Sequence, residues 1–216
     1  MNSKTLAKLK ELNKVAQNEN TKTVTRWMLR ADLDRVADID KLCFWEPWDR
    51  ELINTFMKTK SACGVVTEVE TQAGEWIVVG YNMYMLQPDV LSIIRMGVDP
   101  AHRRRGHGTA MWQRAQNSVD KAKRKYITAH VDEYSLSGQV FLRSMGAPCV
   151  ETDQGRWGRV CMFVWESEHV AFSEDEWNNE ETAAKSSEAE EIWRMMADRA
   201  ELEDESNHEE DNEYLI

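Results

Sequence analysis

The sequence predicts an α+β fold with about seven strands and several helices, followed by an acidic C-terminal tail. Three observations predict it. Runs rich in β-branched and aromatic residues alternate with runs of helical periodicity, in the order β-α-α-β-β-β-α-β-α-β-β. A strand, a glycine-containing turn and a helix meet in VDPAHRRRGHGTAMW, residues 98–112. The charge also changes sharply near residue 166.

Local patterns predict each element of the first half. Thr23 to Leu29 alternates and is rich in β-formers, so we expect a strand. From Ala31 to Cys43 the apolar residues fall on one helical face, and Asp49 is placed as the N-cap of a second helix, Arg50 to Met57. Three strands follow, separated by turns at residues 71–74 and 87–89: Ala62 to Val69, Trp76 to Leu86, and Leu91 to Val98.

The second half continues the alternation. A helix is expected from the 98–112 segment to about Lys125, with basic residues at its end, where positive charge suits the helix dipole. Tyr126 to Val131 predicts a strand, and Ser137 to Met145 a short helix stopped by Gly146. A final antiparallel pair completes the sheet, from Cys149 to Thr152 and from Arg159 to Trp165.

The net charge of −11 is unevenly distributed between a basic body and an acidic tail. Residues 166–216 hold 19 acidic and 3 basic side chains, a net charge of −16, whereas residues 1–165 hold 19 and 24, a net charge of +5. We therefore expect three parts: an N-terminal helical or flexible extension (1–21), a folded domain (22–166) and a partly helical or disordered tail (167–216). Within the tail, Ala189 to Leu202 has the spacing of a helix.

Composition excludes several classes of protein. No apolar run approaches the roughly 20 residues that span a bilayer, and the N-terminus lacks an apolar signal region, so we expect a cytoplasmic protein without a membrane partner. The four cysteines form no CxxC and the five histidines lack ligand spacing, so no metal site is expected. Nucleic acid is not an expected partner, because the acidic tail repels phosphate. A monomer and a homodimer both remain open.

The 98–112 segment is suited to binding a phosphate. The first N–H groups of a helix lack internal partners and the helix dipole favours an anion there. Gly106 and Gly108 remove side chains that would hold a phosphate away, and three arginines precede them. The segment is neither a Walker loop nor a Rossmann GxGxxG. On local evidence alone, a turn followed by a solvated basic helix start explains it equally well.

The order of elements identifies a resemblance. Arg103-x-x-Gly106-x-Gly108, after a strand that ends Val98-Asp-Pro100, resembles the signature of the GNAT superfamily of acetyl-CoA-dependent N-acetyltransferases, over about residues 24–165. Residues 31–40, followed by Cys43-Phe44 and Pro47-Trp48, resemble the branch that acetylates protein N-termini, including those of ribosomal proteins. The resemblance implies a mixed, mostly antiparallel sheet of about seven strands with helices on both faces, and acetyl-CoA as the cosubstrate.

The resemblance also implies a cofactor site. The strand backbone at residues 96–98 would pair with the pantetheine arm in a gap between strands 91–98 and 126–131, and the amides of residues 104–109 would hold the pyrophosphate. Gly97 suits a close ligand approach or a strand bulge. The basic residues near 121–124 suit either a ribose phosphate or a solvated helix end. The expected cofactor-binding residues are Met96, Gly97, Val98, Arg103, Arg104, Arg105, Gly106, His107, Gly108, Thr109 and Ser135.

His130 stands where the N-terminal acetyltransferase branch has a glutamate base, and histidine has a suitable pKa for that work. The alternative is an ordinary strand histidine. Leu142 replaces a tyrosine that donates a proton to the leaving thiolate, so water or Tyr134 would have to substitute, unless Tyr134 is only a loop aromatic. His107 is a further departure, because the residue between the two glycines is usually aliphatic and packs inward.

The acceptor site of such folds is lined by the turn between the first two helices and by the last hairpin. The corresponding residues are Phe44, Trp45, Glu46, Trp48 and Asp153, although packing explains the aromatic ones equally well. We predict transfer of acetyl from acetyl-CoA to a protein N-terminal α-amine, by attack of the neutral amine on the thioester. The alternatives are a small-molecule amine, a lysine side chain, or an acyl-CoA-binding module with weak catalysis.

Overall fold

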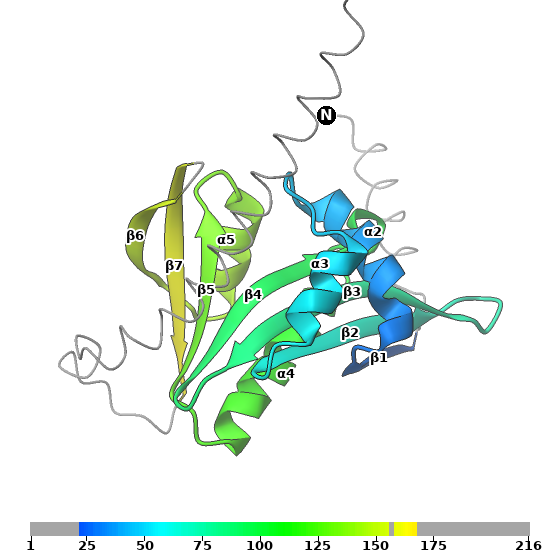
Figure 1. Ribbon diagram of the computed structural model, residues 1–216, viewed down its shortest axis with the longest axis horizontal. Coiled ribbons are helices and arrows are strands. Elements are labelled where there is room, and N and C mark those ends of the chain that lie inside the picture. The colour runs from blue at the N-terminus through cyan, green and yellow to red at the C-terminus, as the bar shows by residue number, and fades with distance from the viewer. Residues whose placement is uncertain (1–21, 156–157, 168–216) are drawn as a thin grey trace, which may run out of the picture. The chain divides into compact units, whose positions relative to one another are not determined.

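The computed structural model describes residues 22–155 and 158–167 (Figure 1). They form a seven-stranded sheet in the order β1-β2-β3-β4-β5-β7-β6, which confirms the predicted fold class. The expected extension (1–21) and nearly all of the acidic tail, including the helix at 189–202, lie outside the described residues. The boundaries 22 and 166 of the folded domain therefore stay a prediction.

The first four strands form an antiparallel meander into which two helices are inserted. The predicted first helix begins as a short 3-10 turn, because the Asp32 carboxylate accepts hydrogen bonds from the Leu29 amide at 2.7 Å and from Arg26 at 2.7 and 2.9 Å. The elements are β1 (Thr23–Trp27), the 3-10 turn η1 (Arg30–Asp32), α2 (Leu33–Cys43), α3 (Arg50–Met57), β2 (Ala62–Glu70), β3 (Trp76–Leu86) and β4 (Val90–Val98).

In the second half a helix connects the fourth strand to a parallel fifth strand, and the last two strands form an antiparallel hairpin. Its helix ends at Lys121 rather than near Lys125, and Lys123 then adopts a left-handed backbone with φ 56°. No helix among the described residues is both long and apolar enough to cross a bilayer. The elements are the 3-10 turn η2 (Pro100–His102), α4 (His107–Lys121), β5 (Tyr126–Asp132), α5 (Leu136–Ser144), β6 (Cys149–Gly155) and β7 (Gly158–Glu166).

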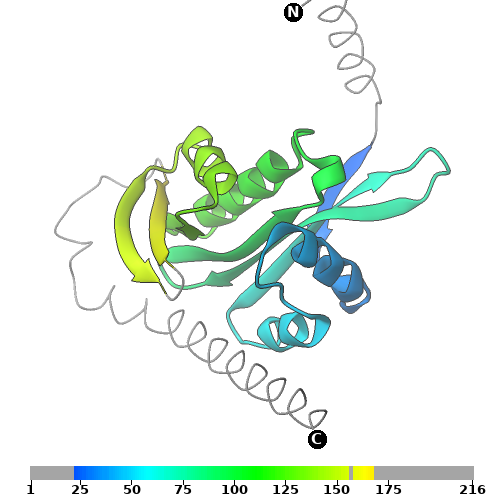
Figure 2. The ribbon, with the colours of Figure 1, turned by 90° about the horizontal axis from the view of Figure 1, so that it is seen from above.

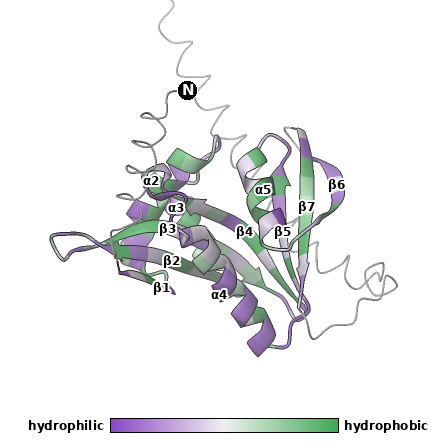
Figure 3. Ribbon diagram, turned by 180° about the vertical axis from the view of Figure 1, so that it is seen from behind, coloured by the Kyte–Doolittle hydropathy of each residue, from purple (hydrophilic) through white to green (hydrophobic). Residues whose placement is uncertain are grey.

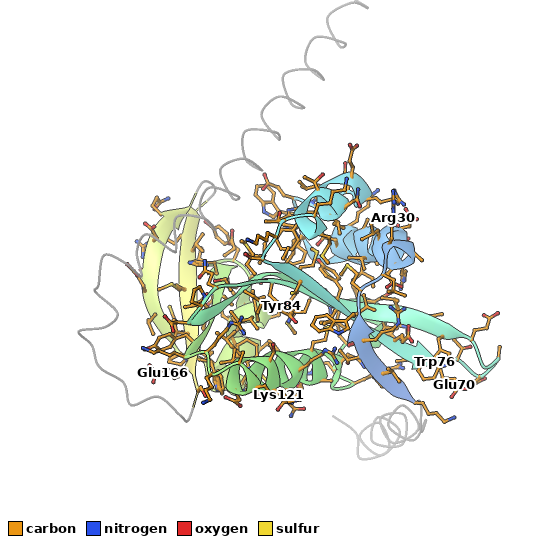
Figure 4. All side chains as sticks on the ribbon, turned by 60° about the horizontal axis from the view of Figure 1, so that its bottom comes forward. Arg30, Glu70, Trp76, Tyr84, Lys121 and Glu166 are labelled. Carbon is orange, nitrogen blue, oxygen red and sulfur yellow. The ribbon has the colours of Figure 1, made fainter. Side chains whose placement is uncertain are left out.

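The helices cover both faces of the sheet. Figure 2 shows α2 and α3 on one side and α4 and α5 on the other. The main core lies under α4 and α5, where Tyr84 is buried between the sheet and α4 (Figure 4). The outer side of α4 is largely hydrophilic (Figure 3), so the helix is amphipathic with its apolar side on the sheet. Other members of this core are Val65, Leu91, Ile93, Trp112, Ala115, Ile127, Leu142 and Phe163.

The sheet is interrupted where β4 and β5 meet. These strands pair in parallel over four residue pairs only, from Val90–Tyr126 to Ile93–Ala129. Beyond that point β4 pairs with β3 alone, and β5 continues against β7. The gap implied by the family resemblance is therefore present.

A bulge in β4 sets which way its side chains point. Tyr84 opposes Ile93, whereas the next residue back along β3, Met83, opposes Arg95, so that Ile94 is an extra residue. Ile93 belongs to the core under α4, and the bulge turns Arg95 to the opposite face, toward α2. The bulge is thus at Ile94 and not at Gly97.

The helix α3 begins at the N-cap residue that the sequence predicts, Asp49. Asp49 has an extended backbone and its carboxylate accepts a 2.7 Å hydrogen bond from the Leu52 amide at the start of α3. We expect Asp49→Ala to lower the free energy of unfolding by about 1 kcal/mol in urea denaturation, and Asp49→Ser to retain most of it. Equal losses in the two variants would contradict the capping role.

Candidate functional site

The loop between β4 and α4 has an unusual backbone. Arg104 and Gly106 both have positive φ angles, 63° and 85°, and Arg105 lies between them with an ordinary one. Such alternation directs successive amides toward one side and creates a concavity for an anion. A Cβ on Gly106 would meet no atom within 4 Å, so glycine is required there by its left-handed backbone and not by crowding. Gly106 is also the N-cap residue of α4, whose first amides are directed out of the helix end.

The three arginines of this loop differ in their roles. The Arg103 side chain turns back, donating from Nε to the Val98 carbonyl at 3.0 Å and from Nη2 to the Cys43 Sγ at 3.3 Å. It therefore braces the loop against α2. Arg104 and Arg105 are exposed, and they supply the positive charge around the helix start.

His107 lies inside the protein at the start of α4. Its side chain is 5% exposed, and its Nε2 has no hydrogen-bond partner among the described residues. Burial lowers its pKa, and the neighbouring His102 and Arg105 lower it further. The His102 ring is centred 6.5 Å away, has a buried Nδ1 that also lacks a partner among the residues described, and has a pKa lowered by burial. His107 therefore takes the inward position of an aliphatic residue at an energetic cost.

The two glycines at 97 and 108 meet different surroundings. A Cβ on Gly97 would lie 2.9 Å from the Tyr81 ring and 3.2 Å from the Cys43 Sγ. Glycine is needed there because Tyr81 and Cys43 pack across it on the α2 face, a reason that neither sequence alternative named. At Gly108 the nearest atoms are the Phe141 ring at 3.4 Å and the Met96 Cε at 3.6 Å, which is ordinary contact.

His130 is exposed on β5, on the face of the sheet opposite α4 and α5. Ile127 and Ala129 belong to the core under α4, so strand alternation places His130 and Asp132 on the other face. Across β7 and β6 the register forms two rows on this face: His130, Met162 and Glu151, then Asp132, Val160 and Asp153. The structure therefore places the predicted base on the same face of the sheet as three carboxylates, those of Asp132, Glu151 and Asp153.

The residues that follow β5 lie around the start of α5. Tyr134 is 78% exposed, and its amide donates to the Asp132 carboxylate at 2.8 Å. Ser135 is exposed at the N-cap of α5, and its hydroxyl oxygen would lie 2.9 Å from a Cβ on Gly138. Leu142 is buried in the core under α4 and α5. Its position therefore offers packing and no proton donor.

The predicted acceptor residues divide into two kinds. The rings of Phe44 and Trp48 lie 4.0 and 4.8 Å from the Arg95 guanidinium carbon, and Trp48 is only 5% exposed. Trp45 is 70% exposed, and Glu46 is exposed as well. Asp153 is exposed on β6, where its carboxylate accepts from the Gln154 amide at 2.7 Å. Phe44 and Trp48 thus serve packing, whereas Trp45 and Glu46 are exposed.

The sequence analysis did not identify Asp40, the buried carboxylate that holds the turn at residues 44–48. Asp40 is completely buried, and it accepts hydrogen bonds from Arg95, from the Tyr81 hydroxyl and from the Trp48 amide. Burial, together with the charge of Asp40, raises the pKa of Tyr81 well above its usual range, so the phenol stays protonated and donates. The signal was present in the sequence, because Asp40 lies one helical turn after Val36 and Arg95 interrupts an apolar strand.

An acidification series tests the cost of His107. Its pKa is lowered in the folded chain, so below about pH 6.5 the unfolded chain binds a proton that the folded chain does not. The free energy of unfolding should therefore fall between about pH 6.5 and the folded pKa, with no loss above that range. We expect His107→Leu to reduce this slope, leaving the part due to His102, and to add about 1–3 kcal/mol of stability at pH 7. Identical slopes in denaturant titrations would contradict this.

Comparison with known proteins confirms the resemblance. Residues 33–147 match the model of the acetyltransferase (GNAT) family. No curated protein matches the chain. The ribosomal-protein-S18-alanine N-acetyltransferase of Escherichia coli is a similar solved structure, with 14% identity and a TM-score of 0.58 over 70% of this chain and 100% of that one.

Two further structures share the fold. NAA60 of Arabidopsis thaliana, solved with a bisubstrate analogue, has 14% identity and a TM-score of 0.59 over 67% of this chain and 99% of that one. The spermidine/spermine N-acetyltransferase SpeG of Vibrio cholerae, solved as mutant forms, has 15% identity and a TM-score of 0.54 over 68% and 95%. At these identities the likenesses show the fold alone.

Proposed function

Because the chain belongs to the GNAT family of acetyltransferases, we propose that it transfers the acetyl group of acetyl-CoA to the α-amine of a protein N-terminus. The family assigns acetyl-CoA as the cosubstrate and an amine as the acceptor. The choice of an α-amine is the part proposed here. The observation that carries the proposal is the gap between β4 and β5, which opens beside the start of α4. His130 is the first residue of β5 after Ala129, the last residue of that strand to pair with β4.

The residues around this gap suit acetyl-CoA. The pantetheine arm carries amides, and the unpaired side of β4 at residues 94–98 offers a strand edge to them. The Arg104–Gly106 concavity and the first amides of α4 suit the pyrophosphate, with Arg104 and Arg105 exposed beside them. Arg103 acts indirectly, by bracing this loop to Val98 and Cys43.

The chemistry requires a neutral amine. Its nitrogen attacks the thioester carbonyl, the C–N bond forms, the C–S bond breaks, and the amine loses a proton while the thiolate leaves. An α-amine has a pKa near 7.7–8.0 and a lysine about 10.4, so an α-amine needs less help from a base to become neutral. His130 is exposed on the open face to accept that proton. Leu142 gives no acid, so the thiolate takes its proton from solvent.

A small polyamine is a second candidate acceptor, favoured by one observation. Asp132, Glu151 and Asp153 share the face of His130, and carboxylates attract an acceptor that carries more than one positive charge. SpeG of Vibrio cholerae, a spermidine/spermine N-acetyltransferase, has the same fold. Spermidine therefore belongs among the acceptors tested.

Mass spectrometry of acceptors after incubation with acetyl-CoA tests the proposal. We expect peptides with a free N-terminus to gain one acetyl group on the α-amine, and N-terminally blocked peptides containing lysine to gain none. A thermal shift with acetyl-CoA, measured in parallel, reports whether the cosubstrate binds. Transfer to blocked lysine peptides or to spermidine alone would reject the α-amine acceptor, and binding without any transfer would indicate an acyl-CoA-binding module.

Replacing the predicted base gives a second test. We expect His130→Ala to lower kcat by about 10²-fold or more, with partial recovery as the pH rises and the free amine loses its proton unaided. The melting temperature should change little, because the side chain is exposed. Val24→Ala, at an exposed position of the edge strand β1, is the control and should leave kcat unchanged. An unchanged rate in His130→Ala would exclude this histidine as the base.

A further inference from the structure

We propose that Arg95 is a positioning residue for the acceptor: it fixes the turn at residues 44–48 so that Trp45 and Glu46 are the side chains that meet the incoming amine. This inference rests on the proposed function, because it takes the turn as one wall of the acceptor site. The Arg95 side chain is buried inside the protein and makes no contact with the acceptor. Its effect passes through the turn that it holds.

The first step is the placement of Arg95 under α2. The bulge at Ile94 turns it to the α2 face, where its Nε and Nη2 donate to the two Asp40 oxygens at 2.7 and 2.9 Å. Arg95 is 7% exposed and Asp40 is fully buried. A planar guanidinium and a carboxylate paired by two parallel bonds have a fixed relative geometry. The pair therefore locks β4 to the last turn of α2, immediately before the turn begins.

The second step is that the same pair binds the turn at two backbone points. The Arg95 Nη2 also donates to the Glu46 carbonyl, and the second Asp40 oxygen accepts from the Trp48 amide at 2.6 Å. These two bonds define the path of the backbone from residue 46 to residue 48. Loss of the guanidinium fork removes the first bond directly and releases the carboxylate that makes the second.

The third step concerns the side chains. Phe44 and Trp48 both place their rings against the Arg95 cation, which leaves Trp48 buried and Phe44 half-buried. Trp45, Glu46 and Pro47 are the exposed members of the turn, and of these Trp45 and Glu46 carry groups that can recognise an amine. An indole face and a carboxylate both attract a cationic or partly charged amine. The exposure of Trp45 and Glu46 to an acceptor thus depends on Arg95 holding Phe44 and Trp48 against its guanidinium.

Arg95→Lys is the informative variant, because lysine keeps the charge but cannot form the planar fork or the two-ring stack. We expect the KM for the acceptor to rise about tenfold or more, since small displacements of positioning groups have large effects. The KM for acetyl-CoA should stay within about twofold, because the cofactor loop is braced separately by Arg103. Hydrogen exchange followed by mass spectrometry should show faster exchange of the Trp48 amide.

Arg26→Lys is the matched control. Arg26 also forms a two-bond pair with an aspartate, at 2.7 and 2.9 Å from Asp32, and the described bonds of that pair involve β1, η1 and β2. It should lower the melting temperature while leaving the acceptor KM and the exchange at residues 44–48 unchanged. If Arg95→Lys does not fold, the double variant Arg95→Met with Asp40→Leu removes both buried charges together and restores a foldable chain for the same measurements.

The outcomes separate this inference from the proposed function. If the native chain transfers acetyl to no amine, the proposed function fails and the inference falls with it. If the native chain is active, an unchanged acceptor KM in Arg95→Lys overturns the inference alone, whether or not the Trp48 amide exchanges faster. An equal rise of both KM values also overturns it, because the effect would then be general. A raised acceptor KM with faster exchange of the Trp48 amide supports it.

Discussion

The side of the sheet that carries α2 and α3 is organised around one buried ion pair, Asp40 with Arg95. Burying two charges is costly, and the pair persists because its bonding capacity is used: two bonds link the partners, and Tyr81, the Trp48 amide and the Glu46 carbonyl take up the rest. These contacts connect α2, β3, β4 and the turn before α3. The pair forms only if the bulge turns Arg95 toward α2 and α2 turns Asp40 toward the sheet. The pair therefore fixes how α2 lies on the sheet.

The sequence predicts most of the fold because its signals are local. The bounds of α3 and β3 were predicted correctly, since an aspartate cap starts the first and a glycine-containing hairpin turn opens the second. The end of α4 was placed too late, at about Lys125, because a run of basic residues continues past the point where the backbone turns left-handed at Lys123. Charge patterns favour a helix end but do not fix the residue at which the backbone leaves the helix.

The site was predicted less completely, and the misses share one physical cause. The glycine loop and the strand gap follow from a contiguous motif and from the family resemblance. By contrast, Asp40 and Arg95 are 55 residues apart and become partners only through the packing of α2 on β4 and the one-residue bulge. Gly97 was explained by a ligand or a bulge, whereas the Tyr81 ring accounts for it. Arg103 was expected among the cofactor-binding residues, which stays a prediction, and the bonds of its side chain to Val98 and Cys43 were not foreseen. Each of these depends on contacts between segments distant in the sequence.

The short parallel junction between β4 and β5 also has a consequence for how the sheet resists opening. The antiparallel pairs on both sides of it are longer, and α4 contacts strands on either side. Four residue pairs therefore form the weakest line of the described sheet, along which partial unfolding separates the meander from the β5–β7–β6 ribbon most easily. A ligand that binds across that line only in the closed sheet raises the free energy of opening by an amount that grows with the ratio of its concentration to its Kd. The gap in which we propose that the cosubstrate binds therefore lies on the line along which the sheet opens, and a ligand bound there would couple the unfolding of the two halves.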